Sequence, residues 1–292
     1  MLHEILPHRY DNAYRPEVAG SHNRVLCYCR DAILLGDGEE ISLPQRKVFP
    51  TEAEDSAFEF AFSIDEEAYF LHAVLEEIEL PGFRWVQVRD LRHNKPFHLA
   101  YSAMTGHHLY RWYQSRQFCG ACGTRTLRDK VERMLYCESC GQKEYPVIMP
   151  AVIVGIIRGN SLLMTKYADR PSPNWALVAG FTEIGEAFEE TVAREAFEET
   201  GLRVKNITYY KSQPWPFSGS LLAGYFCEAQ DDADIRRDEH ELAEAVFVPR
   251  EAIDVRFDGR ALTNEMICCF RDKGADAVLQ QDPLRQKPYP GS

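Results

Sequence analysis

The sequence predicts an α/β protein in which a sheet lies between helices, preceded by a four-cysteine ribbon and a small mixed N-terminal domain. Three observations support this fold class. Residues 147–292 read as strands, helix, strands and helix, an order typical of a sheet covered by helices. Two Cys-x-x-Cys pairs precede them, and residues 1–112 hold short apolar runs separated by turn residues. We therefore expect domains at 1–112, 113–146 and 147–292.

The composition is that of a globular protein. The chain has 292 residues, 45% hydrophobic and 27% charged, enough for two or more domains. A net charge of −12 argues against tight, non-specific nucleic-acid binding. No apolar run could span a membrane, and the first residues lack the basic-then-apolar order of a signal peptide. We expect a soluble, cytoplasmic protein, in which nine cysteines indicate metal ligands or free thiols.

The N-terminal region carries no recognisable chemistry. Strand-like runs lie at 25–29, 32–35, 58–62 and 85–88, and helical character at 100–104 and 109–113. Cys27 and Cys29 share one strand face and would be either a metal half-site or, as we prefer, small core residues. The pair His107-His108 is assigned a structural role, since no further ligands stand at a suitable spacing.

Two cysteine pairs form the strongest metal signal in the chain. The first pair is Cys119 and Cys122, and the second is Cys137 and Cys140. Fourteen residues lie between Cys122 and Cys137, a spacing typical of tetrahedral zinc. Four sulfur ligands leave no position for water, so we expect a structural Zn²⁺ rather than a catalytic one. A thioredoxin-like redox role is disfavoured, because there are two pairs and no βαβ context.

The last domain is predicted from apolar runs around one acidic helix. Strands are expected at 151–157, 161–165, 175–179, 207–211 and 221–227, and a second helix near 260–272. Between Gly180 and Leu202 stand seven glutamates and one basic residue, Arg194. Gly201 is suited to end the helix, because glycine adopts the left-handed conformation cheaply.

On a helical wheel this segment divides into two arcs. One arc, predicted to be buried, holds Val192, Ala193, Ala196, Phe197 and Thr200. The opposite arc gathers Glu195, Glu198 and Glu199, which repel one another unless a cation lies between them. A hard divalent cation that also binds phosphate and water fits this pattern. The alternative is a solvent-facing acidic helix.

Residues 212–220 are predicted to form a proline-rich loop. Trp215 and Phe217 suit stacking on a flat heteroaromatic ring, and Gln213 and Ser220 could add polar contacts. The alternative is that these aromatic side chains close the edge of a core. The acidic run at 231–244 is expected to be mostly a solvated loop, from which one carboxylate could reach the metal site.

One pattern matches a known signature at every fixed position. Gly180, five residues, Glu186, seven residues, and then Arg194-Glu195-Ala196-x-Glu198-Glu199-x-Gly201-Leu202 is the Nudix box. With the four-cysteine ribbon and the sequence SQPWPF at 212–217, the chain resembles the NADH pyrophosphatases of the Nudix superfamily. The resemblance is close over roughly residues 80–270 and departs at Ser218-Gly219, where the family usually continues with proline.

The resemblance implies a Nudix α/β/α sandwich and hydrolysis of NADH or NAD⁺ to nicotinamide mononucleotide and AMP. It implies catalytic Mg²⁺ or Mn²⁺, structural Zn²⁺ and a homodimer. The family's metal ligands fall on the Ala179 carbonyl, Glu195, Glu199 and Glu241, with Glu198 sharing the cluster or orienting water. Glu186 is expected to pair with Arg194, which completes the catalytic set of Glu186, Arg194, Glu195, Glu198 and Glu199.

Substrate contacts are also implied. Phe181 and Trp215 match the family positions that sandwich a base. Tyr145, Glu132 and Arg89 match further contact positions, and the 212–220 segment adds Gln213, Phe217 and Ser220 as candidates. Two alternatives to a NAD(H) pyrophosphatase stay open. One is removal of NAD caps from RNA 5′ ends. The other is a non-enzymatic Nudix nucleotide sensor with a nucleic-acid-binding ribbon, which the complete set of box glutamates disfavours.

Overall fold

The computed structural model describes residues 1–50, 57–168 and 174–280. The chain forms two compact units, one of residues 3–147 with 216–219, the other of residues 1–2, 148–215 and 220 onward. The ribbon therefore clusters with the N-terminal residues. The predicted boundary at 146/147 lies one residue from the division between the units, and the boundary at 112/113 stays a prediction.

The N-terminal unit contains a six-stranded sheet with the order β1-β4-β5-β2-β3-β6. The strands are β1 (Tyr10–Asp11), β2 (Arg24–Cys29), β3 (Ala32–Gly36), β4 (Phe58–Ile64), β5 (Glu67–Ala73) and β6 (Phe83–Gln87). Only β2 and β5 pair in parallel. The 3-10 helices η1 (Arg46–Val48) and η3 (Val88–His93) complete the connections. The predicted runs at 25–29, 32–35, 58–62 and 85–88 correspond to β2, β3, β4 and β6, and β5 is a strand that the sequence interpretation missed.

Helix α1 (Phe97–Ser115) packs on this sheet as one continuous helix, where the sequence indicated two helical segments. Tyr28 donates its hydroxyl hydrogen to the carbonyl oxygen of Ala103 at 2.6 Å, deep in the core. Gly106 permits the close approach, because a Cβ there would lie 2.5 Å from a methyl of Leu26. Cys27 and Cys29 are buried, which agrees with their interpretation as core residues.

The ribbon is a three-stranded antiparallel sheet of β7 (Leu127–Arg128), β8 (Leu135–Tyr136) and β9 (Lys143–Glu144). Its strands are only two residues long. So small a sheet buries little apolar surface, and domains of this kind are usually stabilised by a bound metal ion.

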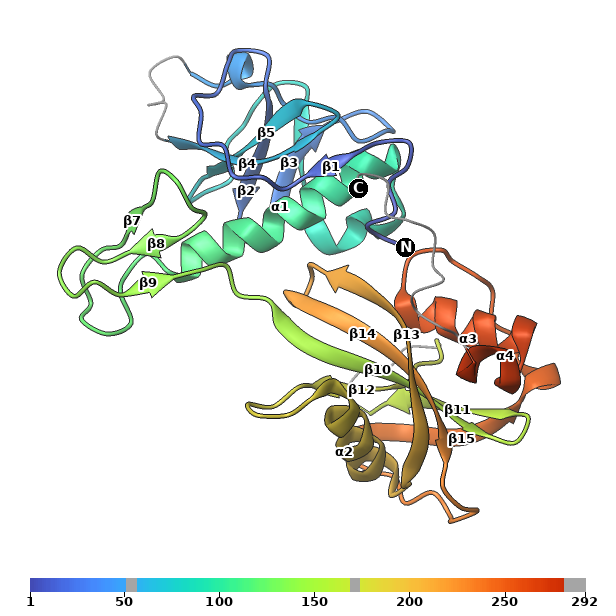
Figure 1. Ribbon diagram of the computed structural model, residues 1–292. Helices are drawn as coiled ribbons and strands as arrows, with labels where there is room; N and C mark the ends of the chain where they lie inside the picture. The colour runs from blue at the N-terminus through green and yellow to red at the C-terminus, as the bar shows by residue number, and fades with distance from the viewer. Residues whose placement is uncertain (51–56, 169–173, 281–292) are drawn as a thin grey trace. The chain divides into compact units, whose positions relative to one another are not determined.

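The second unit is a mixed sheet with helices on both faces (Figure 1). Its order is β13-β14-β10-β11-β15, with β12 paired to β10. The strands are β10 (Met149–Arg158), β11 (Ser161–Tyr167), β12 (Val178–Phe181), β13 (Val204–Trp215), β14 (Ser220–Ala229) and β15 (Leu242–Pro249). The helices are α2 (Phe188–Thr200), α3 (Leu262–Lys273) and α4 (Ala275–Leu279), with a 3-10 turn η4 (Arg250–Ala252).

Side chains point alternately to the two faces of the sheet along β10, which explains why a core lies on each face. Val152, Val154 and Ile156 pack in one core cluster with Val192 and Ala196 of α2. Ile153 and Ile157 face the other side and pack with Met266, Ile267 and Phe270 of α3. Successive strand residues point to opposite faces, so an apolar strand serves two cores. The predicted sandwich is confirmed.

One sequence prediction in this unit was wrong, and a second is confirmed for most of its length. Residues 212–215 belong to β13 rather than to a loop, and Trp215 pairs with Ser220 across a four-residue turn. Pro214 is tolerated because β13 is an edge strand that pairs only with β14. The acidic run does not stay a loop to its end. It enters β15 at Leu242, and Glu244 forms a 2.7 Å ion pair with Lys166. In the described residues, no helix is both long and apolar enough to cross a membrane.

Candidate active site and zinc site

The loop and helix of the box form one hydrogen-bonded unit. The Glu190 carboxylate accepts a 2.7 Å hydrogen bond from the backbone N–H of Ala187 and so caps the start of α2. Gly201 ends the helix with φ of 72°, and its N–H donates to the Phe197 carbonyl at 2.7 Å. The predicted helix end is confirmed.

The predicted division of α2 into two arcs was wrong. Phe197 is 52% exposed, whereas Glu195 and Glu199 are only 8% and 1% exposed. Val192 and Ala196 are buried as expected. The two glutamates lie against the backbone of β12, which shields their carboxylates from solvent.

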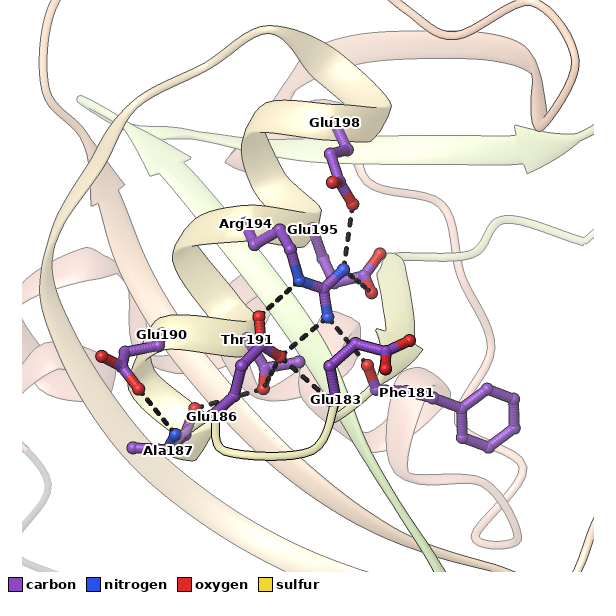
Figure 2. A network of polar contacts seen from close by, with 9 residues as sticks. All are labelled: Phe181, Glu183, Glu186, Ala187, Glu190, Thr191, Arg194, Glu195 and Glu198. Atoms are coloured by element: carbon purple, nitrogen blue, oxygen red, sulfur yellow. Dashed lines mark hydrogen bonds and ion pairs between the residues drawn. The ribbon is translucent and has the colours of Figure 1, made fainter.

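Arg194 ties the loop to the helix. Its Nε and Nη2 donate to the two oxygens of Glu186 at 2.6 and 2.9 Å. Its Nη1 donates to Glu195 at 2.7 Å and to Glu198 at 2.9 Å, and Nη2 also donates to the Phe181 carbonyl at 2.9 Å (Figure 2). Five hydrogen bonds occupy all five donors of a guanidinium. The predicted pairing of Glu186 with Arg194 is present, and it lowers the pKa of Glu186 to about 2.

Glu199 is a buried carboxylate with one oxygen left over. Its Oε1 accepts a 3.2 Å hydrogen bond from the backbone N–H of Ala179, while Oε2 is buried without a hydrogen-bond partner among the described residues. The pKa of Glu199 is raised to about 8, mainly by burial and to a smaller extent by nearby Glu195, Glu241 and Asp238, while the Ala179 N–H works against the shift. A carboxylate in this setting favours a divalent cation, which would satisfy the free oxygen and offset the repulsion.

Glu195 lies directly over Gly180. A Cβ on Gly180 would stand 1.9 Å from the carboxylate carbon of Glu195, so only glycine leaves room for it. Burial raises the pKa of Glu195, although the Arg194 guanidinium works against that shift. The first glycine of the motif thus makes space for a candidate metal ligand.

Glu198 and the acidic loop complete the candidate metal site. The Glu198 side chain is 58% exposed and open to solvent. Glu241 lies near enough to raise the pKa values of both Glu195 and Glu199. Asp238 also acts on Glu199, and its backbone N–H donates to the Glu199 carbonyl at 2.9 Å. Sequence reasoning did not single out Asp238, because nothing distinguishes it from the other acids of that run.

The four cysteines form the one tight group of metal-ligand atoms in the described ranges. The Sγ atoms of Cys119, Cys122, Cys137 and Cys140 all lie within 4.8 Å of one another. The Cys119–Cys140 and Cys122–Cys137 separations are 3.5 and 3.4 Å. Tetrahedral zinc with bonds of about 2.3 Å would place sulfur atoms roughly 3.8 Å apart, so the geometry fits Zn²⁺.

The two cysteine turns are built alike. The N–H of Gly123 donates to the Cys119 carbonyl at 2.9 Å, and the N–H of Gly141 donates to the Cys137 carbonyl at 2.8 Å. Both glycines have φ near 75°, in the left-handed region. Glycine after each cysteine pair is therefore required by the turn and supports the predicted ribbon.

The residues predicted to contact substrate differ in their exposure and in their contacts. Phe181 is 50% exposed at the end of β12, and Trp215 and Phe217 are half-buried. Tyr145 donates its hydroxyl hydrogen to Glu132 at 2.9 Å, so the structure joins these two as a pair. The Arg89 side chain is 81% exposed on η3, where its described contact is with Asp90 at 3.7 Å.

Gln213 and Ser220 do not fit a ligand-binding role. Gln213 is fully buried, its amide nitrogen donates to the Arg260 carbonyl at 2.7 Å, and its amide oxygen accepts from the N–H of Leu262 at 2.8 Å. Its amide thus holds the start of α3 and is not free for substrate. Ser220 is only 3% exposed. The hydrogen bonds of Gln213 and the burial of both residues argue against the predicted polar ligand contacts, which stay predictions.

Comparison with known proteins agrees with this geometry. Residues 147–270 match the NUDIX domain, and residues 114–145 match the NADH pyrophosphatase zinc ribbon domain. The NAD-capped RNA hydrolase NudC of Mannheimia succiniciproducens is 40% identical over 148 residues, covering 48% of this chain and 55% of that protein. The protein of that name from Shigella flexneri is 41% identical over 140 residues, covering 48% and 54%.

The chain spans about half the length of the curated relatives it matches. Among solved structures, a NUDIX hydrolase from Nitrosomonas europaea aligns with a TM-score of 0.47 and 21% identity. That alignment covers 53% of this chain and 90% of the other.

Proposed function

We propose that this chain, which belongs to the Nudix hydrolases that carry the NADH pyrophosphatase zinc ribbon, cleaves the diphosphate bond of NADH or NAD⁺. The products would be nicotinamide mononucleotide and AMP. The observation that carries the proposal is the buried Glu199 oxygen that has no hydrogen-bond partner in the described part of the chain, with Glu195 and Glu241 close by. A metal-free role would not call for a set of carboxylates that repel one another at this position.

The side chains divide the work as follows. Glu195, Glu199 and Glu241, with the Ala179 carbonyl, would hold Mg²⁺ or Mn²⁺. The bound cation would neutralise charge on the diphosphate and lower the pKa of the attacking water. Arg194 donates a 2.7 Å hydrogen bond to the Glu195 carboxylate. Glu198, which is exposed and bonded to the same guanidinium, would orient water. Water attacks phosphorus and a phosphate–oxygen bond breaks, so no covalent enzyme intermediate is needed.

A second candidate function is removal of NAD caps from RNA 5′ ends. The names of the relatives favour it, since each is called a NAD-capped RNA hydrolase. The cleaved bond would be the same one. A net charge of −12 predicts a weak hold on the RNA body, so recognition would rest mainly on the cap.

We further propose a homodimer in the cytoplasm. Ile148 and Met149 at the start of β10 are 59% and 39% exposed, and Leu221, in register with Pro150, is 37% exposed. An apolar surface of this kind is typical of a protein contact. Light scattering coupled to size-exclusion chromatography would give the mass in solution, and a monomer at micromolar concentration would contradict the proposal.

The decisive experiment is a substrate panel with product identification. NADH, NAD⁺, ADP-ribose and NAD-capped RNA are incubated at equal concentration with Mg²⁺ or Mn²⁺. Chromatography measures AMP from the three free nucleotides and nicotinamide mononucleotide from the capped RNA, whose adenosine stays on the RNA. We expect metal-dependent AMP release that Glu199→Gln abolishes. Much faster cleavage of capped RNA would favour the second function. Wild-type protein that binds NADH but never releases AMP would instead be a nucleotide sensor.

A further inference from the structure

The ribbon loop that carries Glu132 is held by the N-terminal domain. Asp129 starts the loop, and its Oδ1 accepts hydrogen bonds from the N–H groups of Val131 and Glu132 at 2.7 and 2.8 Å. The N–H of Met134 donates to the Glu132 carbonyl at 2.8 Å. The backbone on both sides of Glu132 is therefore fixed, although the Glu132 side chain is exposed.

Two contacts anchor this loop to residues far away in sequence. Arg133 donates from Nη2 to the carbonyl oxygen of Ala61 on β4 at 2.5 Å. Its guanidinium also lies 5.0 Å from the ring centre of Tyr14. Tyr14 in turn donates its hydroxyl hydrogen to the Asp129 carbonyl at 3.1 Å. Asp129 and Arg133, which precede and follow Glu132 in the loop, are thus both attached to the first 62 residues of the chain.

A second anchor lies on the neighbouring strand of the ribbon. Arg128 forms a 3.0 Å ion pair with Glu59 of β4, and its guanidinium lies 5.0 Å from the ring centre of Tyr113 on α1. The Glu59 side chain is only 14% exposed, and its other oxygen lies 3.4 Å from the Tyr14 hydroxyl. Glu59 therefore joins both anchors, and the ribbon is braced from β4, α1 and the N-terminal segment together.

We propose that Arg133 and Tyr14 are positioning residues that hold Glu132 against Tyr145, and that this is how the N-terminal domain serves substrate binding. The proposal rests on the proposed function, in which Glu132 and Tyr145 contact the dinucleotide. It assigns a role to a domain that has no chemistry of its own. Neither Arg133 nor Tyr14 needs to touch the substrate, because they act on the backbone beside Glu132.

The test combines kinetics with a measurement that does not depend on turnover. Arg133→Gln and Tyr14→Phe should each raise the KM for NADH about fivefold with kcat within twofold, as expected for one lost hydrogen bond that orders the site. Arg125→Gln, on an exposed ribbon arginine, is the matched control and should leave both constants unchanged. Zinc content, measured by mass spectrometry, should stay at the wild-type level in all three.

A double-mutant cycle separates positioning from general support. In a Glu132→Ala background, Arg133→Gln should change KM less than twofold, because the group it positions is gone. Equal effects of Arg133→Gln in both backgrounds would overturn the proposal. So would a wild-type KM in the single variant.

The second measurement follows Tyr145 directly. Its hydrogen bond to Glu132 raises the pKa of the Tyr145 hydroxyl, which NMR of labelled tyrosine rings can titrate. Arg133→Gln should move that pKa back towards its ordinary value, and Glu132→Gln, the reference variant, should do the same. An unchanged Tyr145 titration would overturn the proposal. Failure of the wild-type chain to release AMP would count only against the proposed function, since the titration still decides whether Arg133 holds the pair.

Discussion

The carboxylate of Glu195 lies where any residue other than glycine at position 180 would carry its Cβ. The distance from that Cβ to the carboxylate carbon of Glu195 would be only 1.9 Å. The substitution Gly180→Ala should therefore displace Glu195. We expect kcat/KM to fall about 100-fold, since shifts of this size in a catalytic group have such costs. Gly120→Ala, where a Cβ meets nothing within 4 Å, should leave activity unchanged. Comparable activity in the two variants would contradict the assignment of Glu195.

The metal-free protein should lose stability as the pH rises. The pKa of Glu199 is raised from an ordinary value near 4.5 to about 8 by burial. The folded state therefore binds a proton that the unfolded chain releases, and its stabilisation disappears as the pH climbs through about 8. The slope is at most about 1.4 kcal/mol per pH unit.

Urea unfolding between pH 6 and 9 checks this, with zinc retained and Mg²⁺ and Mn²⁺ removed. Glu199→Gln should flatten the dependence, because a neutral amide has no proton to lose. Adding Mg²⁺ should restore stability to the wild type and not to the variant. A wild-type profile as flat as that of the variant would show that Glu199 titrates normally.

Phe181→Ala should weaken substrate binding without unfolding the protein. Stacking of an aromatic ring on a base contributes about 1–3 kcal/mol, so the KM for NADH should rise about tenfold. The side chain is half exposed, and the thermal midpoint should hardly move. Phe197→Ala is the control, because Phe197 is exposed to a similar degree on α2. Equal KM values for the two variants would remove Phe181 from the site.

Gln213→Ala should behave as a stability variant. The N–H of Leu262 and the carbonyl of Arg260 would lose their partner in a buried position, at a cost of about 1–3 kcal/mol. Chemical denaturation measures the change, and Gln117→Ala, at an exposed position, gives the reference. A raised KM with unchanged unfolding free energy would instead return Gln213 to the substrate pocket.

Structural features that depend on the spacing of nearby residues could be predicted from the sequence. The two cysteine pairs, the Gly201 helix end and the strand at 151–157 all depend on neighbours within a few residues. The burial of Glu195 and Glu199 does not, because it depends on Gly180 and the Ala179 backbone lying opposite.

Long-range partners account for the other errors. Gln213 is buried by contacts 47 and 49 residues away, and its polar side chain gives no sign of them in the sequence. Pro214 and Pro216 indicated a loop, since proline is rare inside sheets, but strand β13 lies at an edge that tolerates it. The anchoring of Arg133 on Ala61 spans 72 residues and was not foreseen.

Arg194 reaches Phe181 through the backbone oxygen alone, at 2.9 Å. This hydrogen bond therefore does not depend on which side chain residue 181 carries. In the proposed function Phe181 stacks on the base, so a different ring at this position should change the preference among bases and leave the Arg194 hydrogen bonds intact. For an engineer, position 181 is accordingly the first place to randomise when a changed substrate is wanted, and position 194 is the last.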